Sequence, residues 1–155
     1  MMKSNFVIRR ARRADVGSCV DLGKSFHATS YWGSRAYVPE KVAEYAKRTI
    51  ANPYKLFLVS ENEKGIYGLF IAHWSEMFFT DERVSDEEVL WVQKGSGTVW
   101  TMMGFFKEWE LWAKANGCSL MHYNPTSHVQ YAEKWAKFMK RYGYDVAGAS
   151  YRKEL

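Results

Sequence analysis

The stretch that most restricts the fold of this chain is "KLFLVSENEKGIYGLFIAHWSEMFF", from Lys55 to Phe79. It contains two apolar segments rich in β-branched and aromatic residues, separated by the polar turn "ENEKG", which ends in glycine. Two such segments around a short polar turn predict a β-hairpin. Because the strands of a hairpin are antiparallel, the sheet of this chain is expected to be largely antiparallel.

Apolar residues at helical spacing predict four helices around this hairpin. Asp15 can cap the first helix and Pro39 suits the first turn of the second. Gly117 and Gly143 can end the third and the fourth in left-handed caps. The predicted helices cover residues 14–27 and 38–50, the apolar stripe from Met102 to Ala113, and residues 129–143.

Four further segments predict strands: "NFVIRRA" (5–11), "VLWV" (89–92) after the acidic turn "TDERVSDEE", "CSLMHY" (118–123), and "YDVAGASYRKEL" (144–155) as a closing strand or hairpin. This order of elements predicts an α/β (α+β) fold with a mixed, mostly antiparallel sheet of six to seven strands and helices on both faces. The 155 residues show no linker or internal repeat, so we expect a single domain over residues 1–155.

The charge, the apolar runs, the cysteines and the histidines limit the functional classes that this chain can belong to. A formal charge of +5 permits an acidic partner without requiring one, and "IRRARR" (8–13) is more typical of a solvated strand end than of a nucleic-acid site. No run approaches the roughly 18 apolar residues of a membrane span. Two distant cysteines and an N-terminus without an apolar signal segment predict a reduced, cytoplasmic protein. The four histidines lack metal-ligand spacing, so no metal site is expected.

The segment "VQKGSGTVWTMM" (92–103) joins a predicted strand to the third helix. Such loops often hold phosphate, because the first turn of a helix has unpaired N–H groups. The core "KGSGT" offers two glycines, two hydroxyls and one ammonium group. A plain turn capped by Ser96 or Thr98 is the alternative, and a lone Gly-x-Gly does not distinguish the two.

The segments "VLWVQKGSGTVWTMMGFFKEWELWAKANGC" and "AEKWAKFMKRYGYDVAGASYRKEL", together with the order of elements, resemble the GNAT family of acyl-CoA-dependent N-acetyltransferases, including its small phage-type members. The resemblance covers nearly the whole chain. It implies two central parallel strands, here "EEVLWV" and "SLMHY", that splay apart and hold acetyl-CoA as the cosubstrate. Unpaired strand N–H and C=O groups would then pair with the peptide-like pantetheine arm.

The resemblance also implies which residues bind the cofactor. The backbone of Leu90, Trp91 and Val92 would bind the pantetheine arm, and the loop with the first turn of the third helix would bind the pyrophosphate. The expected set there is Lys94, Gly95, Ser96, Gly97, Thr98, Val99 and Trp100, with Asn124 after the next strand. An ungapped match to the family loop, Gln/Arg-x-x-Gly-x-Gly/Ala, places Thr98, Trp100 and Met102 at its glycine positions. Either the helix starts earlier or the phosphate site is degenerate.

Direct acetyl transfer needs a base for the attacking amine and a proton for the leaving thiolate. Glu88 is the expected base, because alternation would place it on one face with Leu90 and Val92; an exposed acidic turn is the alternative. The family's usual acid, a tyrosine, is replaced by Met139, so Tyr142 is the candidate acid, with water or a packing role for Tyr142 as alternatives. The resemblance implies that His27, Tyr31 and Trp32, in the loop between the first two helices, shape the acceptor pocket; packing is the alternative for them.

The sequence thus predicts an N-acetyltransferase that moves an acetyl group from acetyl-CoA to a primary amine of a small molecule, a protein or a modified base. We expect it in the cytoplasm of a bacterial or phage-infected cell, and a homodimer is allowed. The missing glycines and tyrosine favour an alternative, a catalytically degenerate GNAT-fold protein that binds a host protein or nucleic acid. A plain nucleic-acid-binding domain is a third hypothesis, but the chain lacks any recognition-helix or RNA-binding pattern.

Overall fold

A computed structural model describes residues 6–95, 97–124, 132–148, 153 and 154. Its contacts divide the chain into two units, Met1–Asn124 and Pro125–Leu155. The first unit contains, in chain order, β1 (Val7–Arg10), the 3-10 turn η1 (Arg13–Asp15), α1 (Val16–Thr29), the 3-10 turn η2 (Tyr31–Ser34), α2 (Pro39–Ala51), β2 (Lys55–Asn62), β3 (Gly65–Glu76), β4 (Arg83–Val92), α3 (Thr98–Ala115) and β5 (Cys118–His122). The second contains α4 (Ala132–Arg141).

The five strands form one sheet in the order β1-β2-β3-β4-β5. All neighbouring pairs are antiparallel except β4 and β5, which are parallel. The mixed, mostly antiparallel sheet and the four helices were expected, but the expected number of six to seven strands was wrong for the described residues. Residues 144–148 of the expected closing strand have no regular structure, and residues 149–152 and 155 lie outside the described part of the chain.

Strand β4 is longer than the expected four residues, because the segment that we interpreted as an acidic turn belongs to it. Val84 and Ser85 are buried, and the strand pairs with β3 from Arg83 to Val92. The acidic residues of "SDEE" therefore lie within a strand of the sheet, next to the edge strand β5, rather than in an exposed loop.

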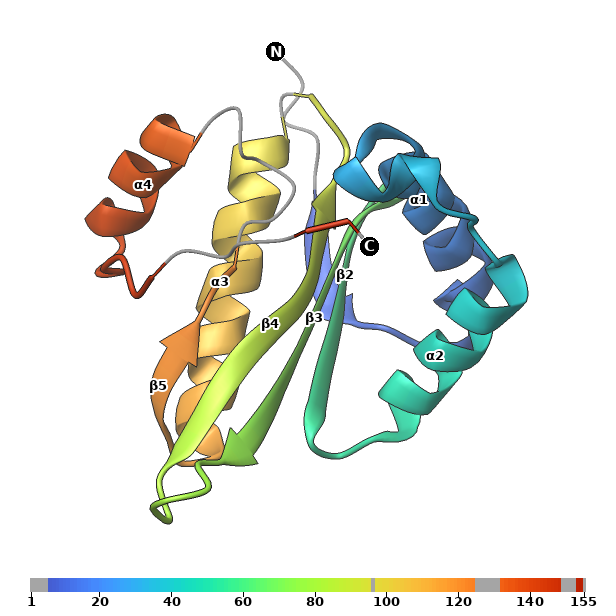
Figure 1. The fold of residues 1–155 in the computed structure, drawn as a ribbon. Coiled ribbons are helices and arrows are strands. Elements are labelled where there is room, and N and C mark those ends of the chain that lie inside the picture. Colours follow the sequence, from blue (N-terminus) through green and yellow to red (C-terminus); the bar gives the residue numbers. More distant parts are fainter. Residues whose placement is uncertain (1–5, 96, 125–131, 149–152, 155) are drawn as a thin grey trace. The chain divides into compact units, whose positions relative to one another are not determined.

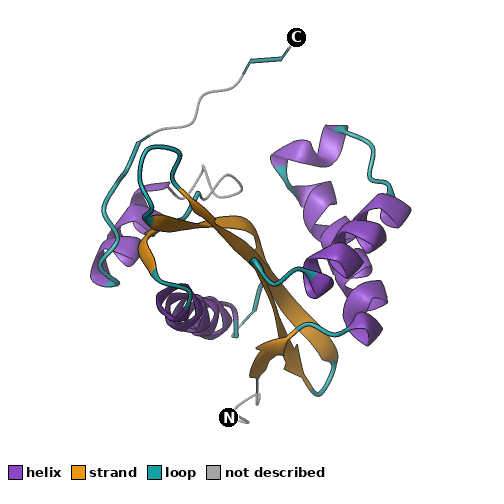
Figure 2. Cartoon of the chain, turned by 90° about the horizontal axis from the view of Figure 1, so that it is seen from below, coloured by secondary structure: helices purple, strands orange, loops and turns teal. Residues whose placement is uncertain are grey.

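Helices cover both faces of the sheet in the first unit (Figure 1, Figure 2). On one face, α1 and α2 pack against alternate strand residues, including Phe57, Val59 and Ile71. On the other face, α3 brings the rings of Phe105 and Trp109 within 5.8 and 5.2 Å of the ring of Phe70. Burial of these apolar faces is the main force that fixes the sheet between its helices.

Two buried polar contacts fix α3 against the sheet. The indole Nε1 of Trp109 donates to Oγ of Ser85 at 2.7 Å, and that hydroxyl donates to the carbonyl of His73 at 2.8 Å. Oγ of Ser60 and Oγ1 of Thr101 lie 3.2 Å apart and share a hydrogen bond. Because each of these buried polar groups has a partner, the register of α3 on the sheet is specific.

The ends of α3 and α4 have the glycines expected there. Gly117 and Gly143 have φ values of +73° and +81°, which are typical of left-handed C-terminal caps. The amide of Tyr144 donates to the carbonyl of Met139, which closes the last turn of α4. None of the helices in the described ranges is long and apolar enough to cross a membrane.

Candidate functional site

The parallel pairing of β4 and β5 ends halfway along β4. The pairs run from Arg83 with Cys118 to Asp86 with His122, where β5 ends. Strand β4 continues from Glu87 to Val92, paired with β3 on its other edge but without a β5 partner in the described part of the chain. Figure 1 shows β4 extending well past the end of β5. This open edge of β4 lies where the splay between "EEVLWV" and "SLMHY" was expected.

The side chains of the open part of β4 anchor the strand and leave its backbone as the accessible group. Leu90 and Val92 are buried, and Trp91 packs against Phe26 of α1 with a ring-centroid distance of 4.6 Å. Backbone N–H and C=O groups on an unpaired edge need partners from water or from a ligand. This edge suits a peptide-like ligand added alongside β4.

The loop between β4 and α3 is closed by Thr98. Its Oγ1 accepts a hydrogen bond from the amide of Gly95 at 2.9 Å and lies 2.7 Å from the carbonyl oxygen of Gln93. Helix α3 begins at Thr98, so Gly95 and Gly97 directly precede its first turn. Ser96 lies outside the described residues. The amides of Val99 and Trp100 have no backbone acceptor among the described residues, as is usual for a first helical turn.

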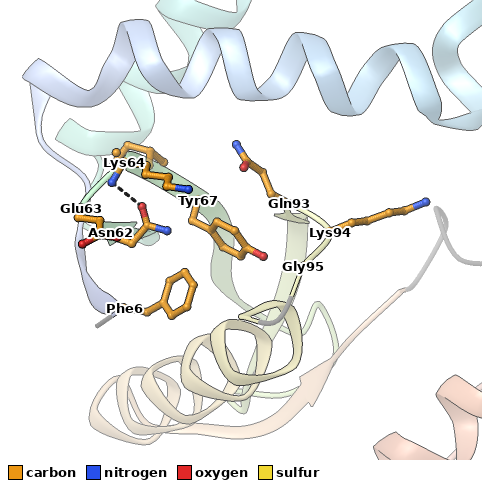
Figure 3. A pocket seen from close by; sticks show the side chains of 10 residues that line it. Phe6, Asn62, Glu63, Lys64, Tyr67, Gln93, Lys94 and Gly95 are labelled. Carbon is orange, nitrogen blue, oxygen red and sulfur yellow. Dashed lines mark hydrogen bonds between the residues drawn. The ribbon is translucent and has the colours of Figure 1, made fainter. Parts of the chain in front are cut away.

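A cavity of about 310 Å³ lies on the β2–β3 side of this loop and is lined by Phe6, residues 62–67 and residues 93–95. Figure 3 shows Phe6 and Tyr67 side by side, with Tyr67 directed toward Gly95 and Lys94 extending away from the two rings. The ammonium groups of Lys64 and Lys94 make no ion pair within the described ranges. Among those residues, Lys94 is therefore a cation without a bound carboxylate beside the first turn of α3.

Glu88 lies in a β-bulge, which changes the face it occupies. Ile71 pairs with Val89 and Ala72 pairs with Glu87, so Glu88 is the extra residue of β4. Its carboxylate accepts hydrogen bonds from Lys55 Nζ at 2.7 and 2.9 Å and from the hydroxyl of Tyr45 in α2.

The prediction that Glu88 shares a face with Leu90 and Val92 was therefore wrong. Lys55 alternates along β2 with Phe57 and Val59, which belong to the core under α1 and α2. Glu88 thus lies on the α2 side of the sheet, because the bulge interrupts the period of two on which the prediction depended.

The surroundings of Glu88 keep its carboxylate charged. Burial alone would raise its pKa, but the hydrogen bonds from Lys55 and Tyr45 outweigh burial and hold the pKa below its usual value. His73 Nδ1 also lies 2.7 Å from Oε1 of Glu88, although the angle is not that of a hydrogen bond. A carboxylate held in this way is a weak base near neutral pH.

Glu87 has the opposite environment. Burial raises the pKa of Glu87 to about 7. The nearby charge of Glu88 also raises this pKa, whereas a hydrogen bond from the backbone amide of Asn124 lowers it. Asn124 follows β5, so this contact links β4 to the chain beyond β5 at the point where the strands separate. A carboxyl group with a pKa near 7 can take up and release a proton at neutral pH.

A second ionisable pair, which the sequence reasoning did not identify, lies where the β4–β5 ladder ends. Nδ1 of His122 is 3.0 Å from Oδ1 of Asp86, and Asp86 pairs across the sheet with His73. The only signal in the sequence was a histidine at the end of an apolar strand. No group of three potential metal ligands occurs within the described ranges.

The expected substrate residues lie at the C-terminal end of α1 and in η2. The His27 ring is 5.3 Å from that of Tyr37, and the partly exposed rings of Tyr31 and Trp32 make an edge-to-face pair at 5.3 Å. This end of α1 is beside the open part of β4, because Phe26 contacts Trp91. Phe26, the residue before His27, thus packs beside the open part of β4, and the substrate roles of His27, Tyr31 and Trp32 stay a prediction.

Tyr142, the predicted acid, follows α4 in the second unit, with its ring 4.9 Å from that of Phe138. Met139, at the position of the family's tyrosine, is buried. The role of Tyr142 stays a prediction, and so do the cofactor roles expected from the resemblance.

Comparison with known proteins shows the fold. The sequence matches no family model and no curated protein sequence. A transcriptional regulator from Bacillus halodurans C-125 has a TM-score of 0.75 at 15% identity, covering 97% of this chain and 100% of that one. An aminoglycoside acetyltransferase from an uncultured soil sample, in complex with sisomicin, has a TM-score of 0.70 at 14% identity, covering 97% of each chain. A GNAT family acetyltransferase from Staphylococcus aureus has a TM-score of 0.64 at 13% identity, covering 99% and 100%. The chain has the GNAT N-acetyltransferase fold.

Proposed function

From the GNAT fold of this chain, we propose that the protein is an N-acetyltransferase that moves an acetyl group from acetyl-CoA to a primary amine by direct attack. The observation that carries the proposal is the open edge of β4 from Glu87 to Val92, which has no β5 partner among the described residues. Its backbone can pair with the pantetheine arm as an added strand would. The first turn of α3 and the ammonium group of Lys94 suit the pyrophosphate.

The reaction needs one group on the protein that accepts a proton. The amine nitrogen forms a bond to the thioester carbonyl carbon, the amine loses a proton, and the carbon–sulfur bond breaks to release CoA as a thiolate, which takes a proton from water. We assign the proton to Glu87, because its pKa of about 7 allows it to be unprotonated in part of the molecules and still basic at neutral pH. Glu88 was the choice from sequence, but its carboxylate is engaged by Lys55 and Tyr45.

The acceptor in this proposal is a small cationic amine. Asp86, Glu87 and Glu88 follow one another on β4, and η2, directly after α1, carries the exposed rings of Tyr31 and Trp32. Carboxylates attract an ammonium group, and aromatic faces bind organic cations. One structural neighbour was solved with the aminoglycoside sisomicin, which is consistent with this class of acceptor.

A second candidate function, a GNAT-fold protein without catalysis, is favoured by one observation in the loop. The amides of Gly95 and Thr98 are both used inside the loop, in bonds to Thr98 Oγ1 and to the Gly95 carbonyl. Fewer amides are thus left for phosphate than a fully open loop would offer. The same fold also occurs in a protein described as a transcriptional regulator.

A thiol-release assay separates these functions. The purified protein is incubated with acetyl-CoA and a panel of polyamines, aminoglycosides and lysine peptides, and free CoA thiol is measured with a chromogenic disulfide. We expect amine-dependent thiol release that Glu87→Gln reduces strongly. Release at the uncatalysed rate with every amine, from a protein that still binds acetyl-CoA, would support the non-catalytic function instead.

A further inference from the structure

We propose that Phe6 and Tyr67 form an aromatic clamp, which holds the β4–α3 loop in the shape that binds pyrophosphate; this inference rests on the proposed function. Position 97 is a glycine in this proposal because the Phe6 ring occupies the space of a side chain there. Phe6 directly precedes β1, and Tyr67 belongs to β3. The shape of the loop would then depend on packing from these two strands.

The space around Gly97, and not its backbone conformation, explains why this position is a glycine. Its φ and ψ of −90° and −5° are helical values that any residue adopts, so its backbone conformation does not require glycine. The residue is buried. A Cβ at this position would collide with Cζ, Cε1 and Cε2 of Phe6. The ring of Phe6 therefore occupies the space that a side chain at position 97 would need.

Tyr67 makes the same kind of contact with Gly95. A Cβ on Gly95 would lie 2.7 Å from the hydroxyl oxygen of Tyr67, and the carbonyl of Tyr67 accepts a hydrogen bond from the amide of Gln93 at 2.9 Å. Figure 3 shows the Tyr67 side chain directed at Gly95. Gly95 also has a φ of +158°, so a substitution there would combine backbone strain with the collision. Gly97 is the cleaner position for a test.

The clamp connects three elements. The centroid of the Phe6 ring is 4.7 Å from that of Tyr67 in β3 and 5.7 Å from that of Trp100 in the first turn of α3. The same packing continues two residues along β1, where a Cβ on Gly104 would collide with Cδ1 of Ile8. Phe6 and Ile8 of the N-terminal segment thus pack against Gly97 and Gly104, and this packing places Phe6 at the loop.

Positioning the loop matters for an anion because its binding groups are main-chain amides. An amide contributes most when it already points at the ligand, since ordering a loop on binding costs affinity. Phe6 does not need to touch the ligand. Its role in the proposal is to fix the direction of the amides between residue 97 and residue 100.

A double-mutant cycle tests the packing without any ligand. Gly97→Ala alone should lower the melting temperature by about 3 °C or more, because an added carbon in a filled space strains the structure. In the Phe6→Ala background the same Gly97→Ala change should cost at least about 2 °C less, because the ring is gone and only the cost of alanine at the N-cap of α3 remains. Equal losses in melting temperature in both backgrounds would show that the Phe6 ring is not the reason for a glycine at position 97. If Phe6→Ala does not fold, Phe6→Leu, which removes the ring but keeps apolar volume, replaces it.

Acetyl-CoA binding tests the positioning. Phe6→Ala should raise the Kd for acetyl-CoA about ten-fold or more, with turnover at saturating acetyl-CoA within about two-fold of wild type. Val7→Ala is the matched control, because Val7 is the next residue of the chain and its side chain is exposed; it should change neither value. Equal Kd values for wild type and Phe6→Ala would overturn the proposed role of the clamp in ligand binding and would leave the proposed function intact. No binding by wild type would overturn the proposed function and the ligand role of the clamp together, while the cycle still decides the reason for Gly97.

Discussion

Nζ of Lys55 lies 2.7 Å from Oε1 and 2.9 Å from Oε2 of Glu88, so the ammonium group is shared between both oxygens of the carboxylate. These contacts hold the pKa of Glu88 down, whereas burial raises that of its neighbour Glu87 to about 7. Adjacent carboxyl groups with separated pKa values are typical of sites where one group moves a proton and the other keeps its charge. The β-bulge produces the separation, because it sends Glu88 to the face of Lys55.

The first prediction concerns turnover. Glu87→Gln should keep acetyl-CoA affinity and lose about 10²- to 10⁴-fold in turnover at neutral pH, the range typical of general acid–base catalysis. The wild-type rate should rise with pH through about 7, because only the unprotonated carboxyl accepts a proton. Glu88→Gln is the comparison variant: it should keep a rate that rises with pH, but with the rise moved to lower pH, because the charge of Glu88 helps to raise the pKa of Glu87. Identical pH–rate profiles for wild type and Glu87→Gln would reject Glu87 as the base.

The second prediction concerns folding stability. In the folded protein Glu87 holds its proton up to a pH of about 7, above the value for an exposed glutamate. Its contribution to stability is therefore complete below a pH of about 4 and declines as the pH rises through about 7. Urea unfolding should show wild type losing on the order of 2–3 kcal/mol relative to Glu87→Gln between these limits. A constant difference across this range would show that burial does not shift Glu87.

The third prediction concerns the ion pair of Lys55. Lys55→Met should destabilise the fold by about 1–3 kcal/mol, because it removes a donor from the half-buried Glu88 carboxylate. The double variant Lys55→Met with Glu88→Gln should lose less than the sum of the single changes, since the two groups interact directly. Denaturant unfolding of the four proteins gives this comparison. Strictly additive losses would mean that the contact contributes nothing.

The fourth prediction concerns the buried hydrogen bond under α3. Ser85→Ala should cost about 1–3 kcal/mol, because Nε1 of the fully buried Trp109 loses its acceptor. Ser119→Ala is the control, because the hydroxyl of that exposed serine makes solvent-exposed contacts with Glu82 and with the carbonyl of Arg83; it should change stability by no more than about 0.5 kcal/mol. Equal unfolding midpoints for wild type and Ser85→Ala would contradict the assigned hydrogen bond.

The sequence was informative where a period or a cap sets the structure. The hairpin of β2 and β3, the starts of α1 and α2 within two residues, and the glycines that end α3 and α4 all follow from local pattern. Asp15 lies at the N-cap position of α1, but the expected cap was wrong, because its carboxylate pairs with Arg9 and makes no capping hydrogen bond to α1. The GNAT fold was recognised from the order of elements and two segments, and the structural comparison confirms it. The parallel neighbours were expected at the right strands, because the resemblance specifies that "EEVLWV" and "SLMHY" lie side by side, and β4 has an open edge where the splay was expected.

The sequence was uninformative where the position of a side chain, or the need for a glycine, depends on residues far away in the chain. Nothing local in "SDEEVL" shows that Glu88 is a bulge residue, because the bulge is a property of the pairing with β3. The same holds for Gly97, whose need for glycine is explained by Phe6, a residue far away in the sequence. The prediction of a sixth strand failed for residues 144–148, where polar and small residues gave only a weak period of two.

The central claim is that the open edge of β4 and the start of α3 bind acetyl-CoA. Calorimetric titration of the purified protein with acetyl-CoA, repeated with CoA, tests it before any acceptor is known. We predict saturable binding of one acetyl-CoA per chain with a sub-millimolar Kd, and a melting temperature that rises with ligand concentration. No heat of binding and no thermal shift up to about 1 mM acetyl-CoA would contradict the claim.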